Sequence, residues 1–267
     1  MKNFAVCFNN KIKESVQVKD ELVSLLKQRN LKVKAIDICN LKSGADFVFV
    51  TGGDGTILKT ARFYAKYKTP VFGVNLGRLG FLSQSSKEDI QKSLDKILNG
   101  EFVVENRIML KCGENNALND FVIKGSDKGR TAKFSLKIND KFVCDYLADG
   151  IIVSTPTGST AYGLSAGGPV LTPALNAFII VPICPHTLNA RPIVVPDSEK
   201  ISIHTDKRKY SIALDGQEFF EVDNKDEKEI IIEKSDYEAK LALLSSDEFY
   251  SVLRSKLHWA THPQWQK

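Results

Sequence analysis

The sequence predicts an α/β N-terminal domain with a doubly wound, mostly parallel sheet, followed by a β-rich C-terminal domain and a C-terminal helix that packs back on the first domain. Short apolar segments at residues 3–9 and 32–38 flank an amphipathic helical pattern, which indicates an α/β fold. The pattern changes near Gly100, because nearly every periodic segment from there to residue 233 is strand-like. We therefore expect an α/β domain over residues 1–100, a β-rich domain over 101–246 and a returning tail over 247–267.

The elements of the first half follow from periodicity. Apolar residues at near-helical spacing, among them Val18, Leu22 and Leu26, predict a helix over residues 13–29. Residues 47–50 are continuously apolar, as in a parallel strand that is covered on both faces. The remaining predicted elements of this half are a helix over 57–67, a strand over 70–74 and a charged helix over 87–99.

The second half is dominated by predicted strands, at residues 134–138, 151–154, 193–195 and 230–233. The polar, turn-rich segments 124–128 and 223–228 are expected to be surface loops whose charges are solvated. Residues 247–256 are expected to be helical again.

Composition places the chain among ordinary globular proteins, since 43% of its 267 residues are hydrophobic and 26% are charged. No apolar run approaches the roughly 18 residues of a spanning helix, and no secretory leader is recognisable at the start. The five cysteines are widely spaced and form no C-x-x-C pair, which argues against a disulfide framework or a zinc ribbon. We expect a reducing, cytoplasmic location and no membrane partner. The net charge of +5 is interleaved along the chain and suits an anionic small ligand as well as nucleic acid.

A glycine loop, Gly52-Gly53-Asp54-Gly55-Thr56, follows the apolar strand at residues 47–50 and opens a predicted helix. Open α/β sheets bind ligands at this place, and free helix N–H groups there favour anions. Asp54 is informative because a carboxylate repels phosphate unless it binds a metal, accepts a proton or contacts a hydroxyl. The loop thus suggests phosphoryl chemistry at a hydroxyl, and Lys59 could reach back to an anion. A tight Asp-Gly turn is the simpler alternative. The sequence contains neither a Walker A motif nor a G-x-G-x-x-G motif after a strand.

A second segment, residues 149–169, is rich in glycine and hydroxyl side chains. It could form a concave, hydrogen-bonding wall with Tyr162 as an aromatic face for a base, or it could be a flexible loop. Within it, residues 163–167 match the G-x-S-x-G pattern of serine hydrolases, but the abrupt turn from strand to helix is missing. Asn119 and Asp120 precede an apolar run and could hold a ribose or make an Asx turn.

Several motifs together resemble the NAD kinase family. The glycine loop alone is shared with lipid kinases and, in related form, with phosphofructokinases. The motifs that narrow the resemblance occur in the family's order, at residues 73–82, 118–120, 149–169 and 185–192.

The resemblance implies transfer of a phosphoryl group from ATP, or from polyphosphate, to the 2′-hydroxyl of the adenosine ribose of NAD, with a divalent cation such as Mg²⁺. Nucleic acid is not an expected partner. Asp54 would accept the hydroxyl proton. The other residues implied to bind substrate are Gly55, Lys59, Asn75, Asn119, Asp120, Asp149 at the nicotinamide end, the pocket residues Thr160, Ala161, Tyr162, Gly163, Leu164 and Ser165, and, as secondary contacts, Lys133 and Gln217.

Two positions depart from the family's pattern. Asp120 stands where relatives usually have glutamate, and Leu147 stands where many have a basic residue. The family also implies a homodimer or homotetramer. Two alternatives remain open at this point: a kinase for a lipid hydroxyl, and a regulator that binds NAD(H) without transferring phosphate.

Overall fold

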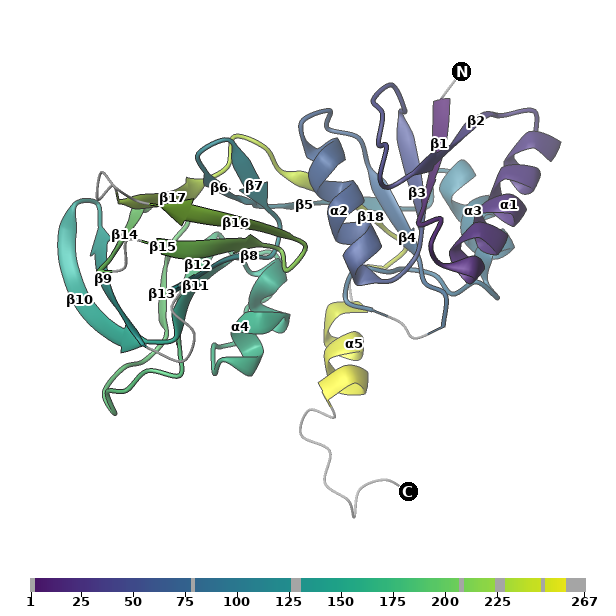
Figure 1. Ribbon diagram of the computed structural model, residues 1–267. Coiled ribbons are helices and arrows are strands. Elements are labelled where there is room, and N and C mark those ends of the chain that lie inside the picture. Colours follow the sequence, from purple (N-terminus) through teal and green to yellow (C-terminus); the bar gives the residue numbers. More distant parts are fainter. Residues whose placement is uncertain are drawn as a thin grey trace, which may run out of the picture. The chain divides into compact units, whose positions relative to one another are not determined.

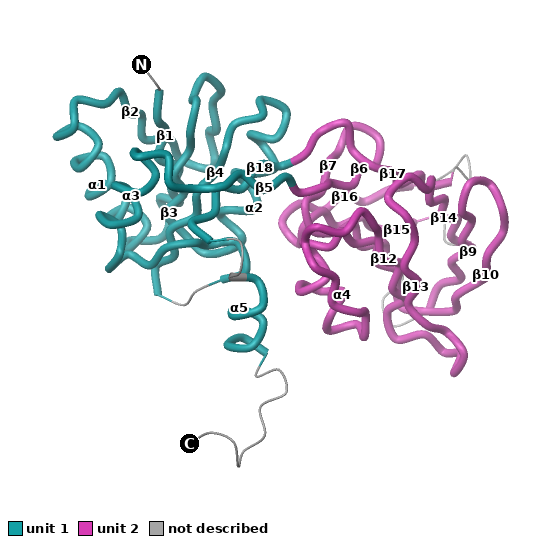
Figure 2. The backbone as a smooth tube through the Cα atoms, turned by 180° about the vertical axis from the view of Figure 1, so that it is seen from behind, with its two compact units in different colours: residues 1–106, 239–267 teal, residues 107–238 magenta. Residues whose placement is uncertain are grey.

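The computed structural model describes residues 3–77, 80–125, 131–206, 209–223, 229–245 and 248–257 (Figure 1). The chain divides into two compact units (Figure 2). The α/β unit comprises residues 1–106 and 239–267, and the β-rich unit comprises residues 107–238.

The α/β unit contains one six-stranded sheet in the order β2-β1-β3-β4-β18-β5. The first four strands of this unit run parallel to one another, and β18 pairs parallel with β4. Its elements are β1 (Asn3–Phe8), α1 (Lys13–Gln28), β2 (Lys32–Asp37), β3 (Phe47–Thr51), α2 (Asp54–Ala65), β4 (Val71–Val74), α3 (Ile90–Leu98), β5 (Val103–Arg107), β18 (Ala239–Leu243) and α5 (Glu248–Leu257).

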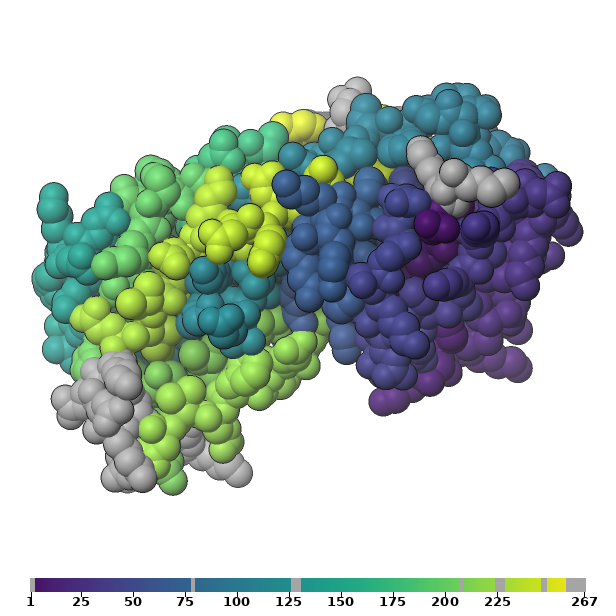
Figure 3. Space-filling model, turned by 90° about the horizontal axis from the view of Figure 1, so that it is seen from above, coloured from purple at the N-terminus to yellow at the C-terminus, as the bar shows by residue number. Residues whose placement is uncertain are grey.

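Helices cover both faces of this sheet. Leu22 and Leu26 of α1 and Leu94 of α3 pack with Phe49 and Phe72 on one face. On the opposite face lies α2, whose Ile57 and Tyr64 are fully buried (Figure 1). Figure 3 shows one face of the molecule, on which the N-terminal residues of this unit are purple to blue. The doubly wound arrangement confirms the predicted fold class.

The chain returns to the α/β unit as a strand. The pattern predicted a return from residue 247, whereas β18 lies between β4 and β5, and residues from Ala239 onward belong to this unit. The alternating sequence of β18 is short and lies beyond a polar turn, so periodicity alone gave no reason to place it in the first sheet.

The β-rich unit contains two six-stranded sheets, ordered β10-β9-β14-β17-β6-β7 and β13-β12-β11-β8-β15-β16. The two sheets share a core of apolar side chains, including Phe121, Phe134, Phe178 and Ile203. The elements are β6 (Leu110–Cys112), β7 (Asn115–Ala117), β8 (Asp120–Gly125), β9 (Ala132–Ile138), β10 (Lys141–Ala148), β11 (Gly150–Ser154), the 3₁₀ turn η1 (Thr157–Thr160), α4 (Tyr162–Ser165), β12 (Ala177–Ile183), β13 (Ile193–Pro196), β14 (Ile201–Thr205), β15 (Lys209–Leu214), β16 (Glu218–Asp223) and β17 (Ile230–Lys234).

Some predicted boundaries differ from the observed ones. The helix α2 begins at Asp54 rather than residue 57, since the glycine loop itself turns into the helix. The predicted loop at 124–128 was wrong for Lys124 and Gly125, which extend β8 and pair with β11 or β15. Residues 126–128 lie outside the described residues, as do 224–228 of the second predicted loop, Arg78 and Leu79 of the motif at 73–82, and residues 258–267 of the tail. Among the described helices, none is long and apolar enough to cross a bilayer.

Candidate functional site

The glycine loop lies at the carboxyl end of β3, beside the point where the strand order of the sheet reverses. Ser15 at the start of α1 donates a hydrogen bond to the Thr51 carbonyl at 2.6 Å, which fixes the end of β3. The backbone then turns at Gly53, whose carbonyl accepts bonds from Thr56 and Ile57 as α2 begins. This is the position at which open α/β sheets bind ligands.

Asp54 is the first residue of α2 and is half-buried. Its Oδ2 accepts a hydrogen bond from the Phe81 amide at 2.9 Å, and its Oδ1 accepts one from the Leu82 amide at 3.2 Å. The helix N-terminus also favours negative charge here. A carboxylate offers about four lone-pair sites, so these two bonds orient it and leave capacity for a substrate hydroxyl.

Two further contacts shape the segment that faces Asp54. The Gly80 amide donates to the buried Ser83 hydroxyl at 2.8 Å. Asn75, which is 2% exposed at the end of β4, accepts a bond from the Gly77 amide at 3.0 Å through its side-chain oxygen. The predicted residues Gly55 and Lys59 lie on α2, Gly55 exposed and Lys59 half-buried.

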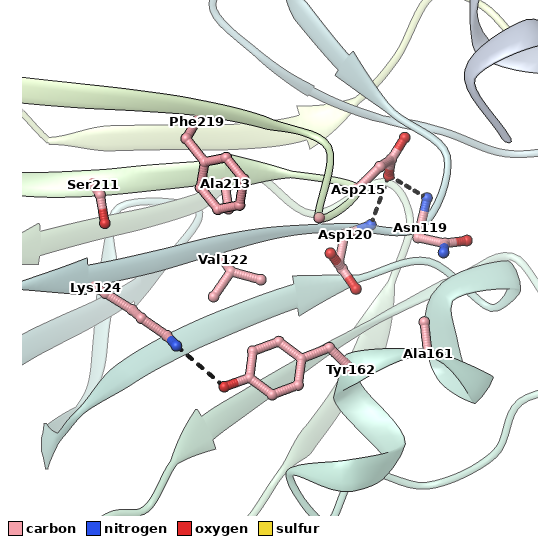
Figure 4. Close-up of a pocket in the computed structure, with 11 residues that line it drawn as sticks. Asn119, Asp120, Val122, Lys124, Ala161, Tyr162, Ser211, Ala213, Asp215 and Phe219 are labelled. Carbon is pink, nitrogen blue, oxygen red and sulfur yellow. Dashed lines mark hydrogen bonds between the residues drawn. The ribbon is translucent and has the colours of Figure 1, made fainter. Parts of the chain in front are cut away.

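A pocket of about 360 Å³ lies in the β-rich unit (Figure 4). Two paired strands form its floor, with alternate residues facing it, while the intervening residues such as Phe121 and Leu214 face the sandwich core. The lining residues are Asp120, Val122 and Lys124 of β8, Ser211 and Ala213 of β15, Asn119, Asp215, Gly216 and Phe219 at the strand ends, and Ala161 and Tyr162.

The Asp120 carboxyl group is buried and points into the pocket (Figure 4). Within the described part of the chain, no group donates a hydrogen bond to it. Burial, with a smaller contribution from the negative charge of Asp215, raises the pKa of Asp120 to about 7. The group therefore changes its charge near neutral pH and is available to a ligand hydroxyl.

Asp215 is oriented by the backbone of the neighbouring segment. Its carboxylate accepts hydrogen bonds from the amides of Leu118, Asn119 and Asp120 at 3.2, 2.7 and 3.1 Å. These bonds hold the start of β8 at the rim of the pocket, as the dashed lines in Figure 4 show for two of them.

Tyr162 and Lys124 meet on the other side of the pocket. The Lys124 ammonium donates to the Tyr162 hydroxyl at 3.2 Å and lies 5.3 Å from the centre of its ring. A ring held in this way offers a stacking face for a base. The expectation that the Lys124 charge is merely solvated was therefore wrong.

The hydroxyl-rich segment is ordered rather than a flexible loop. Thr155 and Ser159 are buried and bond backbone groups, Thr155 donating to the Leu118 carbonyl at 2.6 Å and Ser159 to the Pro156 carbonyl at 2.7 Å. A Cβ at Gly158 would lie 2.3 Å from the Asn119 carbonyl oxygen, so only glycine allows this close approach. These hydroxyl groups support the pocket instead of lining it.

The structure brings only some of the predicted residues into this pocket. Asn119, Asp120, Ala161 and Tyr162 line it. The other predicted residues of the β-rich unit lie outside this pocket: Thr160 ends η1, Gly163, Leu164 and Ser165 belong to α4, Asp149 is exposed between β10 and β11, Gln217 lies in the turn after β15, and Lys133 on β9 pairs with Asp145 at 2.8 Å. The exposed Leu147 lies opposite Lys133 on β10.

Sequence reasoning missed Asp215, Lys124 and Phe219 as pocket residues. For Asp215 and Lys124 the two-residue period of a strand could have indicated this role. Every second residue of a strand points to the same face, so residues 120, 122 and 124 share one face of their strand, as do 211, 213 and 215. Nothing in the sequence paired these two strands. The G-x-S-x-G match is not a nucleophile elbow, since β11 ends at Ser154 and η1 separates it from Ser165.

Known proteins share this arrangement. Residues 2–102 match the ATP-NAD kinase N-terminal domain, and residues 118–244 match the ATP-NAD kinase C-terminal domain. A curated NAD kinase of Clostridium botulinum (strain Loch Maree / Type A3) is 39% identical, with 97% of each chain covered. A curated NAD kinase of Carboxydothermus hydrogenoformans is 44% identical, with 80% of each chain covered.

Solved structures agree. The crystal structure of an NAD kinase from Archaeoglobus fulgidus in complex with ATP is 30% identical with a TM-score of 0.80, covering 97% of this chain and 99% of that one. Yeast NADH kinase complexed with NADH has the same fold, with a TM-score of 0.84 at 21% identity over 100% of this chain and 90% of the other. The models of both ATP-NAD kinase domains match this chain, and curated NAD kinases are similar to it over most of its length. This chain therefore belongs to the ATP-NAD kinase family.

Proposed function

We propose that the protein phosphorylates NAD, moving the γ-phosphoryl group of ATP to the 2′-hydroxyl of the adenosine ribose and forming NADP and ADP. The single observation that carries this proposal is the Asp54 carboxylate at the N-terminus of α2. Two backbone amides orient it at the place where an α/β sheet receives ligands. Phosphoryl transfer depends on such positioning of groups around the attacking hydroxyl.

In this reaction Asp54 accepts the proton of the 2′-hydroxyl. The ribose oxygen forms a bond to the γ-phosphorus as the bond from that phosphorus to the bridging β,γ-oxygen breaks, and the electron pair leaves with ADP. The bonds from Phe81 and Leu82 to the carboxylate limit its rotation, which keeps one oxygen directed at the hydroxyl.

The pocket of the β-rich unit would bind the adenosine part of NAD. Its apolar walls, the Tyr162 ring and the Asn119 and Asp120 side chains match a base and a ribose. The remaining proposed contacts are Gly55, Lys59, Asn75, Lys133, Asp149, Thr160, Gly163, Leu164, Ser165 and Gln217. In this proposal the α/β unit supplies Asp54 and the β-rich unit supplies the dinucleotide pocket.

A divalent cation, proposed to be Mg²⁺, would arrive with ATP. Magnesium at phosphate-transfer sites is held largely by substrate phosphates and water, with one or two carboxylates. Among the described residues, no group of three or more His, Cys, Asp or Glu side chains lies together in a way that could hold a metal ion. When bound, the ion would neutralise charge on the phosphates. We also propose that the enzyme acts in NADP biosynthesis, in the cytoplasm, as a homodimer or homotetramer.

The test is NADP formation from NAD, ATP and Mg²⁺, measured for wild type and Asp54→Asn. Asp95→Asn is the matched control, because Asp95 is an exposed carboxylate on α3 of the same unit. We expect Asp54→Asn to lower kcat by at least about 100-fold, as for loss of a general base, with NAD affinity retained and Asp95→Asn unaffected. A wild type that binds NAD but makes no NADP, with ATP or polyphosphate, refutes the proposal.

A further inference from the structure

Asp215 lies in the tight turn between β15 and β16. Asp215 and Gly216 both have positive φ angles, 52° and 64°, and the Gln217 amide donates to the Leu214 carbonyl at 2.9 Å. Two successive positive φ angles are typical of a type I′ hairpin turn, which Asp-Gly favours. The turn itself explains a small polar residue at this position, but asparagine or glycine would satisfy it equally well.

The Asp215 carboxylate makes contacts that the turn does not need. It is 8% exposed and accepts bonds from the three consecutive amides of residues 118–120. Its own amide donates to the Asp120 carbonyl at 3.0 Å. These four bonds tie the end of β15 to the start of β8.

The tied segment carries two of the polar side chains of the pocket, Asn119 and Asp120 (Figure 4). Removing the carboxylate would leave the amides of residues 118–120 without these bonds at a buried site, and the segment would have to move to find other acceptors. We propose that Asp215 is a positioning residue for dinucleotide binding, because it fixes the backbone that presents Asn119 and Asp120 to the adenosine ribose. The proposal rests on the proposed function of the pocket.

The arrangement has an electrostatic cost that a purely structural turn would avoid. The negative charge of Asp215 opposes ionisation of Asp120 and contributes to its raised pKa. A neutral residue in the same turn would not impose this cost. The bonds that the Asp215 carboxylate accepts from residues 118–120 offset its repulsion with Asp120.

Two variants separate the carboxylate from the turn. Asp215→Gly keeps the positive φ and removes the carboxylate with its bonds to the amides of residues 118–120, whereas Asp215→Asn keeps one acceptor oxygen and removes the charge. Asp140→Gly is the matched control. Asp140 also has a positive φ, 64°, between β9 and β10 of the same unit, but it is exposed, pairs with Lys200 and does not line the pocket.

The measurement is the Kd for NAD by calorimetry on the full-length protein, together with KM for ATP and the thermal midpoint. We expect Asp215→Gly to raise the Kd for NAD about tenfold or more, with a smaller rise for Asp215→Asn and less than about a twofold change in KM for ATP. Asp140→Gly should bind NAD as wild type does. A merely structural role would lower the thermal midpoint without this selective loss of NAD affinity.

Each other outcome has a definite meaning. If Asp215→Gly folds and binds NAD like Asp140→Gly, the inference is overturned. If Asp215→Gly does not fold, Asp215→Asn decides, and an unchanged Kd for NAD overturns the inference. A wild type that binds NAD without forming NADP refutes the proposed reaction alone, whereas a wild type that does not bind NAD refutes the dinucleotide pocket and this inference with it.

Discussion

Gly80 lies against the Asp54 carboxylate so closely that a Cβ at position 80 would come within 1.8 Å of Oδ1 and 2.4 Å of Cγ. No side chain fits there unless the carboxylate moves. The same segment donates the Phe81 and Leu82 amides to Asp54, so glycine permits the approach that makes these bonds. The position of the proposed proton acceptor therefore depends on a residue distant in sequence.

Gly80→Ala should slow phosphoryl transfer because the added methyl group displaces the Asp54 carboxylate from its two amide donors. We expect kcat to fall roughly 100-fold, the scale on which a misplaced reacting group acts, with the Kd for NAD nearly unchanged. The measurement is steady-state NADP formation with parallel calorimetry.

Gly77→Ala is the matched control, since no described atom lies within 4 Å of a Cβ at that position. It should retain kcat within about threefold. Equal loss in both variants would show that the segment tolerates no methyl group anywhere, and that the contact with Asp54 is not the cause.

The sequence predicted the Gly52–Thr56 loop well because local chemistry defines it: an apolar strand, three glycines and a helix start are contiguous. The β-rich pocket was less accessible to prediction. Its floor joins β8 to β15, about ninety residues apart in sequence, and only their pairing reveals that Lys124 and Asp215 share a face with Asp120. The position of β18 was missed for the same reason, because strand order is a long-range property.

Asp120 should make the stability of the protein depend on pH. Its pKa is about 7 in the folded protein and near 3.8 when unfolded, so between these values the folded state holds a proton that the unfolded state has lost. The free energy of unfolding therefore falls as pH rises through this window, and the full loss, about 4 kcal/mol, is present above pH 7. The charged groups that face Asp120 in the pocket are Asp215 and Lys124.

Asp120→Asn removes this cost. We expect the stability advantage of this variant over wild type to be larger at pH 8 than at pH 4.5. The measurement is the difference between the urea midpoints of the two proteins at each pH. Asp145→Asn is a suitable comparison, because salt bridging to Lys133 lowers the pKa of that exposed carboxyl and the sign of its effect is opposite. Parallel curves for wild type and Asp120→Asn would contradict the raised pKa.

Lys124→Met should weaken NAD binding by about three- to tenfold, since the ammonium that holds the Tyr162 ring is lost while the aliphatic stem is kept. Tyr162→Phe removes only the hydroxyl and should cost less. If the lysine acts through this hydroxyl, the double variant should bind no more weakly than Lys124→Met.

Lys141→Met, at an exposed lysine on β10, controls for the lost charge, and an equal effect in that control would contradict the role of Lys124.

Thr155→Val tests whether the buried hydroxyl groups of the segment at 149–169 support the pocket. The Thr155 hydroxyl donates to the Leu118 carbonyl at 2.6 Å and accepts from the Gly158 amide at 3.1 Å, so valine leaves both groups unpaired at a fully buried site. We expect a loss of about 2–3 kcal/mol in the free energy of unfolding.

Thr160→Val is the control. It should lower the free energy of unfolding by less than about 1 kcal/mol, because the Thr160 hydroxyl makes one long bond of 3.4 Å from a half-buried position. Because the Leu118 carbonyl adjoins Asn119, the Thr155 variant should also bind NAD more weakly, and unchanged affinity at reduced stability would confine Thr155 to the fold.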